Sequence, residues 1–119
     1  GRFELASPFP QDLRSYIEND STLSLELRRD TELTAPLLLA MECGQACRAQ
    51  QDISTLIEKM PLGQWQNLSI DLACFTKNGL DAGKVFTPLS LSTAGKLQLS
   101  ISQVSIKPES LKTADLVCR

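Results

Sequence analysis

The sequence of 119 residues contains no histidine. Ser–His and Cys–His nucleophile pairs are therefore excluded, and the commonest general base of enzymes is missing. Two carboxylates facing one cleft could still act as acid and base. The acidic residues, however, fall mostly in loops or on the polar faces of expected strands, as Glu26 and Asp71 do, where carboxylates are solvated surface charges. Gly79 and Gly83 belong to turns and form no phosphate-binding motif. From the missing histidine, the solvated carboxylates and the missing glycine motif together, we predict a non-catalytic chain.

An excess of one charge and a long apolar run are also absent. The 12 basic and 14 acidic residues leave a net charge of −2. The basic pair Arg28 and Arg29 lies between Glu26 and Asp30, so the sequence carries no electrostatic footprint for nucleic acid or anionic lipid. No apolar run approaches the ~20 residues that cross a bilayer. We expect neither nucleic acid nor a membrane as a partner.

The length and composition suit one globular domain. A hydrophobic fraction of 42% is enough to build a core, and a chain of this length leaves no room for a second domain. We therefore expect residues 1–119 to form a single domain, with its core in residues 22–107. The chain opens on Gly1, Arg2 and Phe3 without a methionine or a signal-peptide pattern, so we expect it to be a fragment of a longer protein.

Regular alternation of apolar and polar residues is the main pattern in the sequence. Residues 22–28, 68–72 and 96–102 place apolar side chains at every second position, which is typical of half-buried strands. Residues 36–41 are apolar on both faces and predict a central strand, with Pro36 at its first position. Closely spaced strands with one or two short helices predict an all-β fold, a jelly-roll β-sandwich.

The last expected strand carries an irregularity. Its apolar phase jumps after Leu97, Leu99 and Ile101 to Val104 and Ile106. A jump of phase within a strand requires a bulge or a bend. We predict such an irregularity between residues 101 and 104.

The rest of the chain predicts little regular structure. Residues 52–60 fit a short helix that Asp52 caps and Pro61 ends, and residues 10–17 fit a helical turn. The alternation stops after Lys107, so we expect an irregular C-terminal end that Cys118 tethers.

Four cysteines, Cys43, Cys47, Cys74 and Cys118, are present. An even number in a small domain favours disulfides and an oxidising compartment, with three pairings open. A zinc site is the alternative, since Cys43 and Cys47 have a spacing that a metal could use. Without histidine, Cys74 and Cys118 would have to join them, although structural zinc sites usually consist of two close pairs. Buried free thiols are a third alternative. We expect disulfides and no metal.

Carbohydrate binding is the ligand chemistry that the sequence supports best. The aromatic content is only 5%, and we expect the four phenylalanines, Phe3, Phe9, Phe75 and Phe86, in the core. Trp65 is out of phase with the apolar residues of its strand, so its ring could face solvent and stack on a sugar. Gln64 and Gln66 flank it, and Tyr16 is a second aromatic platform. The alternative, which we favour because a large apolar ring usually finds cover, packs Trp65 beneath the loop at residues 61–63.

A structural calcium ion is an unsupported alternative. Asp30 and Glu32 lie in the loop after an expected strand, where β-sandwiches often bind calcium. No run of alternating oxygen ligands accompanies them, so we expect no cofactor.

Residues 22–107 resemble a known family in several motifs. C-G-x-x-C occupies residues 43–47, G-x-W-x-x-L-S-I occupies residues 63–70, and L-x-C-F occupies residues 72–75. In this order, with the helix at 52–60 between them and residues 87–95 after them, they are similar to the galactose-binding-like domain at the C-terminus of certain bacterial family 3 glycoside hydrolases. Those enzymes are exo-acting β-glucanases and β-glucosidases.

The resemblance implies a jelly-roll domain attached to a separate catalytic barrel. In that family the nucleophile and the acid/base belong to the catalytic domains, so neither role transfers to a residue of this chain. Cys43, Cys47 and Cys74 match the family pattern, which supports a periplasmic or extracellular protein. The resemblance leaves sugar binding by the domain itself open, because function does not follow from fold alone.

Three roles remain open at this stage. The first is a structural accessory domain that packs on the catalytic domains of a β-glucan-degrading enzyme and contacts carbohydrate, and it predicts an apolar interface patch on the isolated chain. The second is an autonomous carbohydrate-binding module with Trp65 or Tyr16 as its platform. The third is a protein-interaction domain that uses a sandwich edge or the loop between Cys43 and Cys47.

Overall fold

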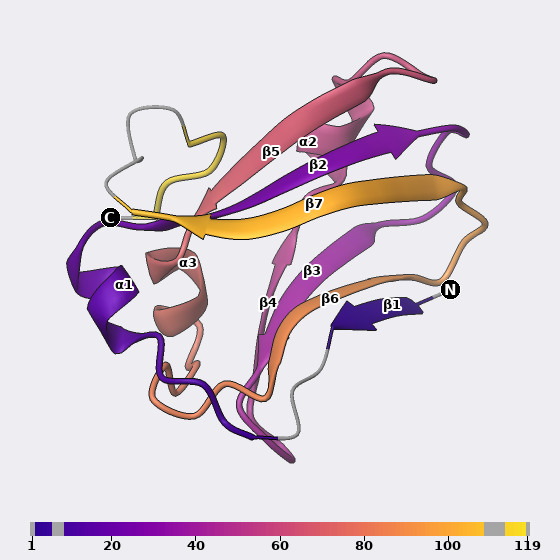
Figure 1. Ribbon diagram of the computed structural model, residues 1–119. Helices are drawn as coiled ribbons and strands as arrows, with labels where there is room; N and C mark the ends of the chain where they lie inside the picture. The colour runs from indigo at the N-terminus through magenta and orange to yellow at the C-terminus, as the bar shows by residue number, and fades with distance from the viewer. Residues whose placement is uncertain (1, 6–8, 109–113, 119) are drawn as a thin grey trace.

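The computed structural model describes residues 2–5, 9–108 and 114–118, and these form two antiparallel sheets packed face to face (Figure 1). In chain order the strands are β1 (Arg2–Leu5), β2 (Thr22–Arg29), β3 (Leu37–Glu42), β4 (Arg48–Asp52), β5 (Trp65–Asp71), β6 (Thr87–Thr93) and β7 (Leu99–Lys107). One sheet has four strands in the order β1-β6-β3-β4, and the other has three in the order β5-β2-β7. The chain crosses repeatedly between the two sheets, as in a jelly roll. This result confirms the all-β jelly-roll β-sandwich that the sequence predicts.

The four-stranded sheet is built from β1 (Arg2–Leu5), β3 (Leu37–Glu42), β4 (Arg48–Asp52) and β6 (Thr87–Thr93). The strand β3 lies between β6 and β4, which confirms the central strand expected from its apolar residues. Its residues Leu39, Ala40 and Met41 are fully buried. The strand begins one residue after Pro36, whose backbone lacks a donor for the ladder.

The three-stranded sheet contains β2 (Thr22–Arg29), β5 (Trp65–Asp71) and β7 (Leu99–Lys107). The inward leucines of β2 and β5 pack in the core between the sheets. The strand β7 starts three residues later than the expected strand at 96–102. Its preceding segment instead donates backbone N–H groups to side chains, from Lys96 to Thr34 Oγ1 at 3.0 Å and from Gln98 to Thr31 Oγ1 at 2.9 Å.

The predicted irregularity in β7 is a β-bulge. Leu27 lies opposite Ile101, whereas its neighbour Glu26 lies opposite Gln103, so Ser102 has no partner on β2. The extra residue lets Leu99 and Ile101 before it, and Val104 and Ile106 after it, all face the core.

The described part of the chain has three short helices rather than one or two. They are α1 (Arg14–Glu18), α2 (Ser54–Glu58) and α3 (Ala73–Thr76). The first two replace the longer helical segments expected at 10–17 and 52–60. The N-cap of α2 is Ile53 rather than the expected Asp52, which is the last residue of β4 and accepts the Ser54 N–H at 2.9 Å from just before the cap. None of the helices in the described ranges is long and apolar enough to cross a membrane.

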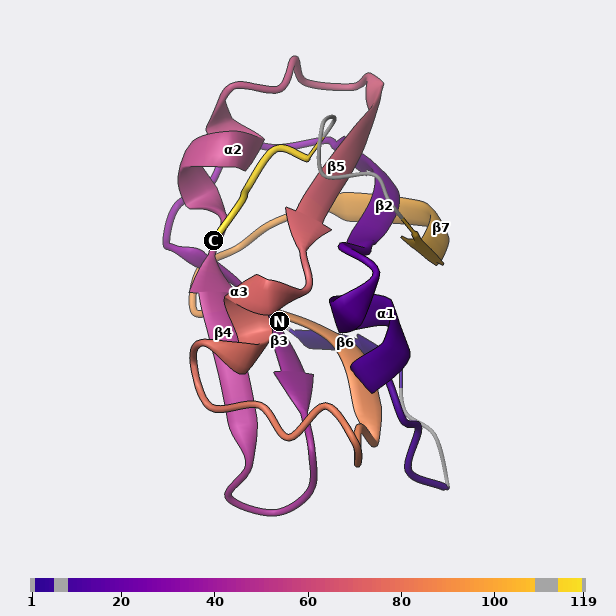
Figure 2. The same cartoon turned by 90° about the vertical axis from the view of Figure 1, so that its left-hand side faces the viewer.

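Two disulfides close the chain, Cys43–Cys47 at the turn between β3 and β4, and Cys74–Cys118 between α3 and the C-terminal segment. Residues near Cys118 also pair with the outer edge of β5, where Asp71 donates its N–H to the Leu116 carbonyl at 2.8 Å. The expected tether through Cys118 is therefore present. Figure 2 shows this segment running beside β5 and α3.

Candidate functional site

The outer face of the three-stranded sheet is the first candidate site. Side chains that are partners across strands point to the same face, so the pairing register identifies the residues that share it. Trp65 lies opposite Arg28, and Arg28 lies opposite Ser100 on its other side. We call this surface the Trp65 face. Its outward residues are Glu26 and Arg28 of β2, Trp65, Asn67 and Ser69 of β5, and Ser100, Gln103 and Ser105 of β7.

Trp65 is the aromatic residue of this face. Its side chain is 44% exposed, so the cover that we favoured from the size of the ring is wrong. The phase of the strand explains the exposure, because Leu68 and Ile70 point to the core and Trp65 therefore points outward. The guanidinium carbon of Arg28 lies over the ring, 5.2 Å from its centre, which is the distance of a cation–π contact.

Arg28 is itself held in place. Its Nε donates to Asp30 Oδ1 at 2.7 Å, and the pair is half-buried. Ser100 Oγ lies 3.4 Å from both Arg28 Nη2 and Asp30 Oδ2 and closes the network. The guanidinium is thereby held over the Trp65 ring.

The rest of the Trp65 face is polar. Glu26 accepts a hydrogen bond from Ser102 Oγ at 2.9 Å, and the amides of Asn67 and Gln103 are exposed beside it. These groups offer both donors and acceptors. From Trp65 to Ser69 the face extends about 13 Å along β5.

The loop before Trp65 is anchored from the end of β2. Gly63 donates its N–H to the Arg29 carbonyl at 2.8 Å. The buried Arg29 side chain donates from Nη2 to the Met60 carbonyl at 2.5 Å. Gly63 has a φ of 73°, a conformation that glycine adopts at no steric cost. These contacts fix the point at which β5 begins.

The other residues predicted for sugar binding are not gathered around Trp65. Gln66 lies opposite the fully buried Leu27 and so points to the inner side of the sheet. Gln64 is exposed and precedes β5. Tyr16 lies in α1 beside Ser21, whose N–H donates to the Tyr16 carbonyl. It is therefore about 20 Å from Trp65 along β2, at the far end of the sheet (Figure 1).

Sequence reasoning missed most residues that share the Trp65 face. Arg28, Glu26 and Gln103 stand on other strands, and a single sequence does not state which strands are neighbours. The alternation that predicted each strand did place these residues on polar faces, and that was the available signal.

The calcium alternative has no support in the side-chain contacts. The carboxylate of Asp30 binds Arg28 and Ser100, and in the described residues no three His, Cys, Asp or Glu side chains gather as metal ligands.

The clearest pKa shift lies away from the Trp65 face. The Arg14 side chain donates hydrogen bonds to the exposed Asp12 carboxylate and, with the Arg14 backbone N–H, lowers the pKa of Asp12 to about 2.

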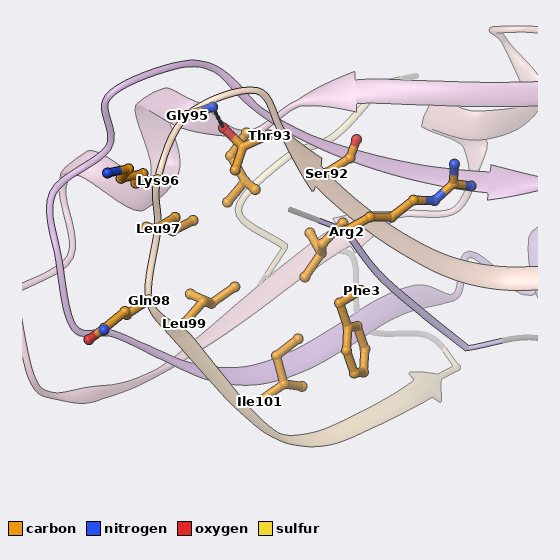
Figure 3. Close-up of a pocket in the computed structure, with 12 residues that line it drawn as sticks. Arg2, Phe3, Ser92, Thr93, Gly95, Lys96, Leu97, Gln98, Leu99 and Ile101 are labelled. Carbon is orange, nitrogen blue, oxygen red and sulfur yellow. Dashed lines mark hydrogen bonds between the residues drawn. The ribbon is translucent and has the colours of Figure 1, made fainter.

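A second candidate site lies where the two sheets separate. Figure 3 shows Phe3 of β1 beside Leu99 and Ile101 of β7, and together they line a groove of about 570 Å³. We call it the edge groove. Its remaining lining residues are Arg2, Leu37, Leu91, Ser92, Thr93, Gly95, Lys96, Leu97 and Gln98. Because the groove is open, Phe3 is 42% exposed, which together with the exposed Phe9 corrects the expectation that all four phenylalanines are core. Phe75 is fully buried.

Comparison with known proteins gives one family match. Residues 1–106 match the family model Exop_C, which is described as galactose-binding domain-like. No curated protein matches the chain.

Solved structures give the same picture. The exo-1,3/1,4-β-glucanase ExoP from a Pseudoalteromonas species superposes with a TM-score of 0.73 at 20% identity, over 98% of this chain and 14% of the glucanase. The extra C-terminal domain of that enzyme gives 0.72 at 21% identity, over 99% of this chain and 64% of the domain. The family 30 carbohydrate-binding module of a cellulosomal cellulase of Clostridium thermocellum superposes with a TM-score of 0.71 at 21% identity. The match covers 92% of this chain and 68% of the module.

Proposed function

Because the chain belongs to the Exop_C family of galactose-binding-like domains, we propose that it is the non-catalytic accessory domain of an exported β-glucan-degrading family 3 glycoside hydrolase, and that it contacts the glucan through the Trp65 face. The observation that carries this proposal is the exposed Trp65 ring on a polar sheet face. An indole presents a large, flat apolar surface with a polar edge, against which the C–H face of a sugar can stack. Glu26, Asn67 and Gln103 supply hydrogen-bond partners for the hydroxyls.

The relatives support the class of ligand. One of them is an exo-1,3/1,4-β-glucanase, and another is a carbohydrate-binding module. Both have the fold of this chain. We therefore propose a β-1,3- or β-1,4-linked glucan as the ligand.

Two features support an exported protein and an accessory role. Both disulfides are of the kind that persists in the periplasm or outside the cell. The apolar edge groove is the exposed patch expected of a domain that packs on its catalytic partner. The disulfides support export, and the groove favours an accessory domain over an autonomous module.

The test is a titration of the chain with cellohexaose and laminarihexaose. Trp65 is the only tryptophan, so its fluorescence reports contact with this face. We expect saturable quenching with at least one ligand. Calorimetry repeats the titration with Trp65→Ala, because that variant has no indole signal, and we expect affinity to fall at least tenfold, or about 1.4 kcal/mol.

Tyr16→Ala is the matched control, since Tyr16 is 40% exposed but lies at the far end of the sheet. It should leave the affinity unchanged. Absence of both quenching and heat with either ligand, or equal binding by folded Trp65→Ala, would show that the Trp65 face does not bind glucan.

A further inference from the structure

The sandwich is closed on one side and open on the other. The inward residues of β2 and β5, such as Leu27 and Leu68, are fully buried. Those of β7, such as Leu99 and Ile101, are only partly buried although they face the same core. On the other sheet the groove is bordered by the four-residue strand β1, by the start of β3 at Leu37 and by the end of β6 at residues 91–93 (Figure 1). The edge groove is therefore an unfilled part of the space between the sheets.

Two of the strands that border the groove, β1 and β7, are edge strands. Within the described residues, β1 pairs only with β6 and β7 pairs only with β2. The other two outer strands are covered. At β4, Gln51 Nε2 donates to the Cys74 carbonyl and Asn78 Nδ2 to the Gln50 carbonyl. At β5, Asp115 donates its N–H to the Ser69 carbonyl.

An unpaired edge next to an apolar groove suits one kind of ligand. An extended peptide can pair its backbone with the free N–H and C=O groups of an edge strand while every second side chain enters the groove. The nine residues of β7 give room for such pairing. A glucan has no comparable row of apolar groups.

The charge of this part of the chain selects among peptides. Residues 82–108 contain three lysines and no acidic residue, in a chain whose net charge is −2. Lys96 lines the groove. Arg2 also lines it but is bound by Glu4 at 2.8 Å and Glu42 at 2.9 Å, so Lys96 supplies the local positive charge. Symmetric pairing of β7 with the same strand of a second copy would bring lysines against lysines.

We infer that the edge groove binds an extended, apolar peptide strand that carries acidic residues near its ends. The strand adds to β7 and fills the space between the sheets. Only the source of this strand rests on the accessory role proposed above, which assigns it to the adjoining catalytic part of the enzyme. The inference concerns a different surface from the Trp65 face, so the failure of one test leaves the other standing.

The probe is a synthetic ten-residue peptide in which valine and threonine alternate and aspartate occupies both ends. Two control peptides have the same length. One carries lysine at both ends in place of aspartate, and the other carries proline at two central positions. Binding is followed by amide shifts and hydrogen exchange of the whole chain labelled with ¹⁵N. We expect the acidic peptide to slow exchange along β7, the lysine peptide to bind at least fivefold more weakly at low salt, and the proline peptide not to bind.

A charge variant tests the site without touching the core. Lys96→Glu should reverse the preference between the acidic and the lysine peptide, whereas Lys77→Glu, an exposed control beside α3, should not change it. Ile101→Asp should abolish binding in a folded chain.

Three results would overturn the inference. The first is equal affinity for the acidic and lysine peptides. The second is protection that maps to strands other than β1 and β7. The third is a concentration-dependent dimer that protects β7 without peptide, which would assign the groove to a second copy of the chain.

Discussion

Arg28 and Trp65 are partners across adjacent strands, with the guanidinium carbon 5.2 Å from the centre of the indole ring. The contact covers part of the ring and restricts its motion, while 44% of the Trp65 side chain stays open to solvent. A platform that is already ordered loses less conformational entropy when it binds. The face therefore combines exposure with order.

The first prediction concerns this contact. Arg28→Gln removes the charge over the ring and weakens the link to Asp30, so Trp65 should become more mobile. We expect glucan affinity to fall about two- to fivefold, as for a loss of about 0.5–1 kcal/mol, and acrylamide to quench the free protein more strongly. Arg48→Gln is the control, because Arg48 pairs with Glu42 on the other sheet. Unchanged affinity and quenching in Arg28→Gln would refute an orienting role.

The alternation in the sequence predicted β2, β5 and the bulge in β7, and the apolar run at residues 36–41 predicted β3. It missed β1, β4, β6 and α3, and for the two edge strands β1 and β4 the reason is physical. The strand β4 has the sequence Arg-Ala-Gln-Gln-Asp, in which only Ala49 is fully buried, and β1 has four residues. Edge strands bury few side chains, so they carry little periodic signal.

The sequence could predict that Trp65 faces solvent, but it could not predict which other residues share its face. The phase of β5 placed Trp65 outward, although we gave more weight to the size of its ring. Gln66 was expected beside it because it is adjacent in sequence, but adjacent residues of a strand point to opposite faces. Arg28, which contacts the ring, is distant in sequence and reaches it only through the pairing of β2 with β5.

The second prediction compares the two disulfides. Cys74–Cys118 closes a loop with a sequence separation of 44, and Cys43–Cys47 one of 4. In the loop-entropy description these correspond to about 4 and about 2 kcal/mol of stability. The double variant C74A/C118A should therefore lower the free energy of unfolding in urea by more than C43A/C47A. The C-terminal segment should also lose its hydrogen-exchange protection beside β5. Equal losses in both variants would contradict the entropic explanation.

The third prediction concerns pH. Hydrogen bonds from Arg14 hold the pKa of Asp12 at about 2, below its usual 3.8. A carboxylate with a lowered pKa in the folded state stabilises the fold above about pH 4, and this contribution is lost as the pH falls through 2. An NMR titration of the Asp12 carboxyl carbon should give a midpoint near 2, and Arg14→Gln should raise it towards 3.8. Lys77→Gln should leave it in place. A wild-type midpoint near 4 would show that the ion pair does not persist in solution.

The last prediction uses the bulge at Ser102. Deletion of Ser102 would leave Leu99, Ile101, Val104 and Ile106 in regular alternation, each opposite its present partner on β2. We therefore expect this deletion to fold, with a loss below about 1.5 kcal/mol that reflects the missing bond to Glu26.

Deletion of Ser105 is the matched control for this experiment. It removes one residue from the same strand but turns Ile106 away from the core, and the loss of that burial should cost about 2 kcal/mol or more. Urea unfolding of both variants measures the difference. A Ser102 deletion as damaging as the Ser105 deletion would mean that the bulge itself, through the bend it gives to β7, is required for the fold. If the Ser102 deletion is stable, its glucan affinity then shows whether the bulge is kept for the Trp65 face, because the deletion removes one hydroxyl from that surface without changing its aromatic platform.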